Sequence, residues 1–330
     1  MTLLLLLAAL DEAPATDAPT VEEAAVEEAA VEEAAVEEVA VEEVVAAPAA
    51  WTPTRVKNAE LESSMPIFGA LTTVVFDLQE RGNQITDMSV GVLHHDTPAS
   101  NKHFFGEGSE VSFTVLGDPE RISDFEVVLM DPNGKQVATG ELLSSIDFGS
   151  NDDGEAMPVP VVHRLTYEAA TNGYHEVQVR MKQGSDDWGV GYYSSVLSYA
   201  SASPIGISET LLTMLFAVTL AETEGLKVQA ANWTTVSEDS RVEIAIPVDT
   251  SFDECLAFGM ASESRVKTLD IDVAEPGGQT IARDTKGKKD AVGGVDFAPN
   301  IAGDWRFGLT ATKMQRGVSD SHAAVLMGCM

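Results

Sequence analysis

The sequence predicts a mainly β protein: two tandem antiparallel β-sandwich modules of jelly-roll-like type, each preceded by a short helix, behind a low-complexity acidic N-terminal arm. Residues 109–138 recur without a gap as residues 253–282, so one unit is present twice. Apolar residues alternate along both copies with the period of two that a half-buried strand requires. Each copy then reaches a Pro-Asn-Gly or Pro-Gly-Gly turn, which reverses the chain into the next strand.

The first 20 residues are expected to form a leader segment. They contain the apolar run 3–10, which is too short to span a bilayer but has the length of a signal-peptide core. No Lys or Arg precedes this run, and Ala13-Pro14-Ala15 supplies a weak small-residue cleavage site. We therefore expect export to the cell envelope or the extracellular space, and no transmembrane span.

Residues 21–50 form an acidic arm built on a repeated VEEAA motif. A five-residue period carries the valines around a helix axis, so they form no apolar stripe for docking. Glu23 and Glu27 lie four residues apart, and like charges at that spacing destabilise a helix. We expect a solvated arm that is disordered or fluctuates between helix and coil.

The charge excludes some partners. The formal net charge is −33, and residues 1–50 hold 13 acidic and no basic residues. Such a chain repels nucleic acid and anionic lipid, so neither is an expected partner.

The two modules are expected over residues 65–202 (copy one) and 203–330 (copy two). Each opens on an apolar helical segment, which follows Pro66 in copy one and Pro204 in copy two and ends at Gly82 or Gly225. The strands alternate in hydropathy and are expected over residues 85–93, 111–115, 125–130, 174–181 and 192–199 of copy one, and 226–233, 242–248, 269–273, 305–311 and 323–327 of copy two. Pro132 and Pro276 should occupy equivalent turns.

The modules resemble the bacterial pre-peptidase C-terminal domain and related sandwiches of secreted proteins. The resemblance rests on residues 269–278 and the later stretch 303–309, and it is partial in copy one. It implies a non-catalytic module of an exported protein, with calcium or polymers among the ligands of the family. We expect the modules to act without an attached protease or other catalytic domain.

An acidic insertion of 14 residues in copy one offers candidate calcium ligands. Its oxygen-bearing side chains are Asp147, Asn151, Asp152, Asp153 and Glu155. Carboxylates and amides around glycines are the ligands that calcium prefers. The spacing is not that of an EF-hand, and a plain acidic turn is the alternative.

Histidines and aromatic residues give two further candidates. His94 and His95 point to opposite faces of a strand, so a shared metal would need His95 together with His103; a solvated hairpin tip is the alternative. Trp188, Tyr192 and Tyr193 offer a carbohydrate-stacking platform, with core packing as the alternative. Asp270 and Asp272 alternate with apolar residues and are expected to share a solvent face.

Cys255 and Cys329 are predicted to form a disulfide within copy two, because the strands that carry them are neighbours in sandwiches of this kind. Two buried free thiols are the alternative. In copy one, Val111 takes the first position, and Tyr199 or Ala200 lies near the second.

The positions shared by the copies are turn and core positions, so we expect a non-catalytic structural or binding protein without a cofactor. Its partner would be an envelope protein or a glycan. Alternatives are a calcium-dependent glycan- or protein-binding module and a hydrolase accessory subunit. The sequence leaves the oligomeric state open.

Overall fold

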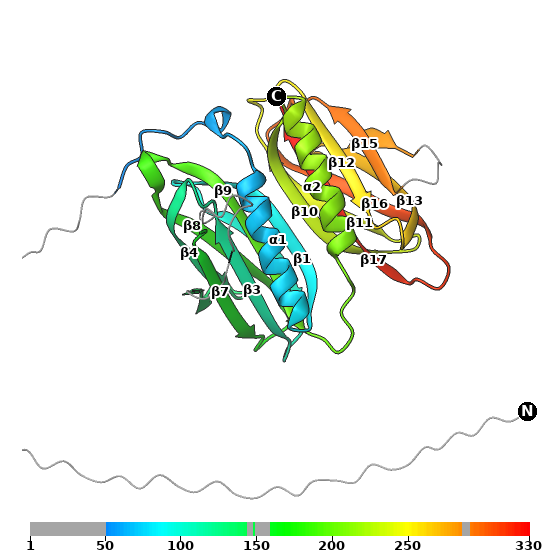
Figure 1. Ribbon diagram of the computed structural model, residues 1–330, viewed down its shortest axis with the longest axis horizontal. Coiled ribbons are helices and arrows are strands. Elements are labelled where there is room, and N and C mark those ends of the chain that lie inside the picture. Colours follow the sequence, from blue (N-terminus) through cyan, green and yellow to red (C-terminus); the bar gives the residue numbers. More distant parts are fainter. Residues whose placement is uncertain (1–50, 144–147, 149–158, 286–290) are drawn as a thin grey trace, which may run out of the picture. The chain divides into compact units, whose positions relative to one another are not determined.

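We describe a computed structural model of the chain over residues 51–143, 148, 159–285 and 291–330. Residues 51–330 form one compact unit (Figure 1). The expected arm, residues 21–50, lies outside the described residues.

Copy one is a helix followed by an eight-stranded jelly roll with one additional short strand. The helix α1 spans Met65–Glu80. The strands are β1 (Asn83–His94), β2 (Ala99–Phe105), β3 (Glu110–Gly117), β4 (Ile122–Met130), β5 (Gln136–Thr139), β6 (Glu141–Leu142), β7 (Val162–Glu168), β8 (Gly173–Gly184) and β9 (Val190–Ala200). The strand order is β1-β9-β3-β7 in one layer and β2-β8-β4-β5 in the other, which is the order of a jelly roll.

Copy two repeats this plan strand for strand. Its helix α2 spans Ser208–Thr223. The strands are β10 (Lys227–Ser237), β11 (Arg241–Val248), β12 (Cys255–Ala261), β13 (Val266–Ala274), β14 (Thr280–Asp284), β15 (Val292–Phe297), β16 (Gly303–Met314) and β17 (Asp320–Cys329). The order β10-β17-β12-β15 against β11-β16-β13-β14 matches copy one, so the predicted tandem sandwich fold is confirmed.

The two copies share one sheet. Strands β1 and β10 pair antiparallel, which joins the inner layers into a nine-stranded sheet of order β15-β12-β17-β10-β1-β9-β3-β7-β6 (Figure 1). One face of this sheet packs on the two four-stranded sheets, which gives each copy its own sandwich core. The other face packs under α1 and α2, whose core draws on both copies.

The equivalent turns confirm the repeat. Asp131 and Glu275 each accept a backbone hydrogen bond from the glycine three residues later, Gly134 and Gly278. Pro132 lies against Gly173, and Pro276 lies against Gly303. These two glycines have φ near +145° and +142°, a conformation that a side chain disfavours, and a Cβ on Gly173 would approach the Pro132 ring to 2.7 Å.

Two details differ from expectation. Pro66 and Pro204 are not equivalent: Pro66 lies in the first turn of α1, whereas Pro204 precedes α2 by four residues. Asp270 and Asp272 share the face of β13 opposite the core, but Asp272 is buried rather than solvated. Arg241 on β11, across β16, donates two hydrogen bonds to its carboxylate, at 2.9 and 3.2 Å. The ion pair lets a carboxylate lie where alternation alone predicts exposure.

The segment before α1 also packs on copy one. The Trp51 ring meets the His95 ring edge-on at 6.2 Å, and Leu61 is buried. The Arg121 guanidinium lies 3.8 Å from the centre of the Trp188 ring and donates a hydrogen bond to the Glu60 carbonyl. The folded part of copy one therefore begins well before α1, at about Trp51.

Candidate ligand-binding site at the open end of copy one

The two sandwiches are closed differently at one end. In copy two the disulfide Cys255–Cys329 joins the start of β12 to the end of β17, with the Cα atoms 4.1 Å apart. This confirms the predicted bridge. The register of the paired strands places Val111 and Tyr199 at these two positions of copy one. The end that is stapled in copy two is therefore without a bridge in copy one.

A hollow of about 600 Å³ occupies this end of copy one. Four strands and one turn supply its walls: Thr86 and Asp87 come from β1, Lys102 to Phe105 from β2, Ser109 to Val111 from the start of β3, and Leu197 and Tyr199 from β9.

Three of the equivalent positions in copy two are filled by small or apolar residues. The helix offset of 143 residues places Ala230 at the position of Asp87, Ile246 at that of His103 and Val248 at that of Phe105. All three are buried in copy two. The copies therefore differ at these three lining positions, whereas Glu110 of the lining matches Glu254 and the strands are the same.

Asp87 is the most unusual group in the hollow. It follows a β-bulge in β1, and burial raises the pKa of its carboxyl to about 7. The side chain is half-buried because it opens into the hollow. A carboxyl placed where the other copy has alanine costs stability, which is the pattern expected of a group kept for binding.

His103 is packed among aromatic rings. Its ring lies 5.3 Å from that of Phe113 and stacks on Phe105 at 6.2 Å. Burial lowers the pKa of His103 to about 4, so the ring is neutral at physiological pH. It offers a flat ring and neutral hydrogen-bonding nitrogens.

Two neighbouring aromatic rings are exposed on β2 and β8, and one of them, Phe104, belongs to a residue that lines the hollow. Phe104 on β2 is 61% exposed, and its register partner Tyr174 on β8 is 66% exposed. Their ring centroids are 5.4 Å apart in an edge-to-face arrangement. Tyr199 adds a third partly exposed ring. Sequence reasoning missed all three as a group because they come from different strands.

The aromatic platform predicted from Trp188, Tyr192 and Tyr193 is wrong. Tyr192 and Tyr193 are buried, and the Tyr192 hydroxyl donates a hydrogen bond to the Val228 carbonyl of copy two at 3.1 Å. Trp188 is covered by the guanidinium groups of Arg55 and Arg121. These rings belong to the core and the copy junction.

The metal hypotheses have different outcomes. The calcium candidates Asp147, Asn151, Asp152, Asp153 and Glu155 lie outside the described residues. Within the described ranges, no three His, Cys, Asp or Glu side chains lie close enough to hold a metal ion. His95 packs on Trp51 and His103 on Phe113, so the structure does not bring this histidine pair to one site.

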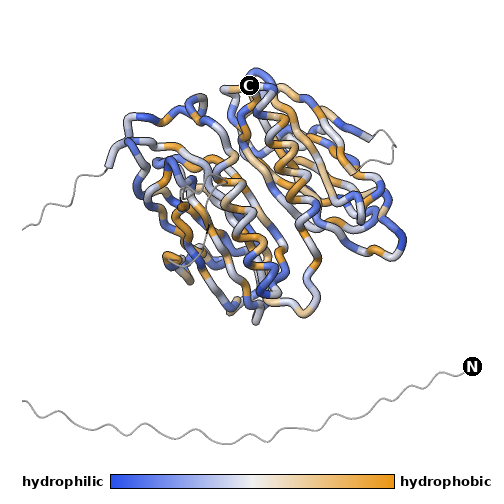
Figure 2. Tube along the Cα trace, in the orientation of Figure 1, coloured by the Kyte–Doolittle hydropathy of each residue, from blue (hydrophilic) through white to orange (hydrophobic). Residues whose placement is uncertain are grey.

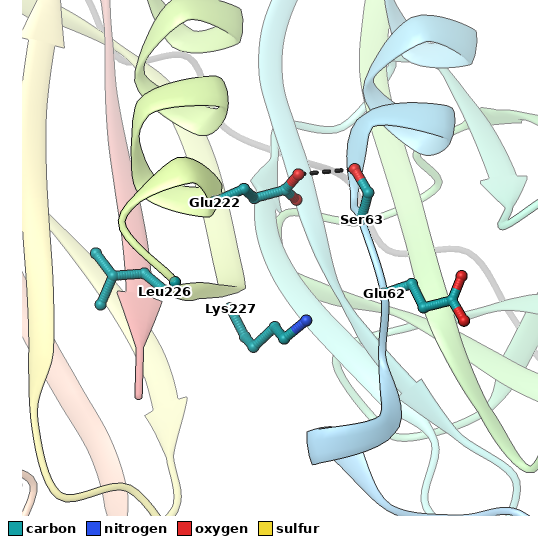
Figure 3. Close-up of a pocket in the computed structure, with 6 residues that line it drawn as sticks. Glu62, Ser63, Glu222, Leu226 and Lys227 are labelled. Carbon is teal, nitrogen blue, oxygen red and sulfur yellow. Dashed lines mark hydrogen bonds between the residues drawn. The ribbon is translucent and has the colours of Figure 1, made fainter.

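A smaller hollow of about 320 Å³ lies at the junction of the copies (Figure 3). Glu62, Ser63, Glu222 and Lys227 are among its lining residues. The Ser63 and Ser64 hydroxyls donate to the Glu222 carboxylate at 2.7 Å, and the Ser64 amide donates at 2.6 Å. The Glu222 carboxylate already accepts three hydrogen bonds from the chain itself. We therefore interpret this hollow as part of the contact between the copies and not as a ligand-binding site.

No family model matches the chain, and no curated protein matches it. Several solved structures resemble it weakly. The tandem CBM51 modules of a family 98 glycoside hydrolase from Streptococcus pneumoniae share 12% identity with a TM-score of 0.24, covering 73% of this chain and 83% of that one. A catalytic domain with two CBM51 domains from Clostridium perfringens shares 8% identity at a TM-score of 0.24, covering 72% of this chain and 34% of that one.

The major capsid protein of bacteriophage PM2 shares 10% identity at a TM-score of 0.19, covering 73% of this chain and 98% of that one. At this level of similarity these structures do not assign a function.

Among the described residues, no helix is long and apolar enough to cross a membrane.

Proposed function

We propose that this chain is a non-catalytic, exported binding protein that takes a saccharide at the open end of copy one. The observation that carries the proposal is the hollow itself, which lies where two otherwise matching sandwiches differ. A duplicated scaffold whose copies differ in residues that line one cleft points to a site grafted on a stable fold.

The lining favours a neutral, hydroxyl-bearing ligand. Exposed rings such as Phe104 and Tyr174 stack on the apolar faces of sugar rings, and carboxyl oxygens such as those of Asp87 accept hydrogen bonds from hydroxyls. His103 is held neutral by its surroundings, so it supports binding better than acid–base chemistry at neutral pH.

The disulfide supports export. Bridges of this kind persist in oxidising compartments and are rare in the cytosol. The resemblance to pre-peptidase C-terminal domains agrees with an exported module and remains a prediction.

The test is isothermal titration of the full chain with a panel of soluble polysaccharides. We expect binding to at least one, weakened by Phe104→Ala and Tyr174→Ala by about tenfold each, corresponding to ~1.4 kcal/mol. Ile281→Ala is the control, because this apolar side chain is also exposed but lies on β14 of copy two. Absence of binding at millimolar saccharide, or equal affinities in all variants, would refute the proposal.

The calcium-dependent form of this function is tested separately. Thermal melts with and without millimolar calcium report binding, because a ligand that binds only the folded state raises the melting temperature. An unchanged melting temperature would remove calcium while leaving the saccharide proposal intact.

A further inference from the structure

The outer side of the helix layer carries large apolar side chains. On α2, Leu212, Phe216 and Leu220 follow each other at a spacing of four and are 58%, 71% and 44% exposed. Met65 and Phe76 of α1 are also exposed. Figure 2 shows hydrophobic colour along the helices. We call these five residues the apolar helix face.

This face can be desolvated at little cost in free energy. Five threonines of the two helices, Thr72, Thr73, Thr213, Thr219 and Thr223, each donate a hydrogen bond to the backbone carbonyl four residues earlier, at 2.8 to 3.3 Å. Their hydroxyls therefore need no water as an acceptor. Covering them costs little free energy, whereas covering an unpaired hydroxyl costs about 1–3 kcal/mol.

The charges of α2 are already engaged. Its two carboxylates lie at its ends: Glu222 accepts from Ser63 and Ser64, and Glu209 accepts from Ser262 and Ser264. Partial desolvation raises the pKa of Glu209, but these hydrogen bonds outweigh it and leave the pKa below its ordinary value. Between Glu209 and Glu222 the helix carries no charge, in a chain of net charge −33.

We propose that the apolar helix face is the interface of a two-fold dimer, in which α2 of one chain packs against α2 of a second copy. Charge selects this occupant. A basic partner is drawn to the carboxylate-rich surfaces of the chain, and an anionic membrane is repelled. A second copy presents the same uncharged side of α2, so this is the approach in which two strongly acidic chains repel each other least.

The size of the face agrees with a weak dimer. A 16-residue helix is about 24 Å long, and two helices side by side are about 20 Å wide, so each chain offers roughly 500 Å². Two chains then bury about 1,000 Å², the lower limit for a specific interface. We expect a dissociation constant on the order of 1–100 μM.

Sedimentation of the full chain at concentrations from about 1 to 500 μM tests the proposal. We expect reversible dimers, which strengthen with added salt because salt screens the mutual repulsion. Leu212→Glu and Phe216→Glu should abolish the dimer. Leu142→Glu should not, since Leu142 lies on β6 and is 65% exposed, close to the exposure of Leu212.

Unchanged circular dichroism melts should confirm that the variants fold. A chain that stays monomeric at the highest concentration overturns the proposal, as does a dimer that persists in both helix variants. Binding of the monomer to phosphatidylcholine vesicles, lost in Phe216→Glu, would assign the face to a lipid surface instead and would equally overturn it.

Discussion

Ser89 of β1 pairs directly with Asn232 of β10, and these two residues occupy the same position in the two copies. They are 143 residues apart, the offset that also relates the helix starts Met65 and Ser208. A residue that pairs with its own counterpart lies on a two-fold axis. The chain is therefore a covalently linked pseudo-dimer, joined edge to edge through one sheet, which removes one exposed strand edge from each copy.

The same two-fold relation joins the helix ends. Glu222 near the end of α2 accepts three hydrogen bonds from Ser63 and Ser64 at the start of α1, and its counterpart Gln79 accepts one from Ser208 at 3.5 Å. We expect Glu222→Ala to lower the free energy of unfolding by about 1–3 kcal/mol, because the buried Ser64 loses its acceptor. Urea unfolding measures this. Glu224→Ala is the control, and equal effects of the two substitutions would contradict the assignment.

Removing the bridge should destabilise copy two. The disulfide closes a loop of 73 residues, for which the chain-entropy model gives about 4 kcal/mol as an upper figure. We expect Cys255→Ala combined with Cys329→Ala to lower the melting temperature, and a reductant to lower that of the wild type but not that of the variant. Thiol labelling of the denatured, unreduced protein should find no free thiol, and finding two would disprove the bridge.

Asp87 should make the protein less stable as the pH rises. Its folded pKa of about 7 lies above its unfolded value of 3.8, so the folded state binds the extra proton between these values, and stability falls as the pH rises through that window. Asp87→Asn removes the ionisation. We expect the variant to gain stability over the wild type between pH 4 and 8, by up to about 4 kcal/mol and less where water in the hollow solvates the carboxylate.

Asp131→Asn is a control of opposite sign. Backbone hydrogen bonds from Lys135 and Asn133 hold the pKa of Asp131 below its ordinary value, so its contribution is present above the unfolded pKa and is lost as the pH falls. Denaturant titrations at pH 4, 6 and 8 compare the two. A pH-independent difference between wild type and Asp87→Asn would rule out the assigned pKa.

Deleting residues 1–50 should leave the melting temperature unchanged within a few degrees, because the VEEAA repeat forms no apolar stripe to bury. The truncation must keep Trp51, whose ring packs on His95. A larger drop in calorimetry would show that the arm docks on the folded unit.

The sequence by itself determined the features that depend on short stretches of chain, namely strand alternation, turn chemistry and the internal repeat. Alternating hydropathy predicted most strands of both copies but not β2, β7 and β15. The turn chemistry of Pro132 and Pro276 placed equivalent reversals, and the repeat carried one fold into the other. The pairing of Cys255 with Cys329 followed because only one partner exists and both lie on strands of the same layer.

Only the tertiary structure decided the junction and the candidate site. The pairing of β1 with β10 depends on which edges meet, and hydropathy alternates in the same way on an edge strand and on an inner one. Alternation also could not distinguish the buried Tyr192 from the exposed Tyr174, because both lie on late strands. Asp87, Phe104 and Tyr199 come together only because the consecutive strands β1 and β2 meet the distant strand β9 at an end of the sandwich that no disulfide closes.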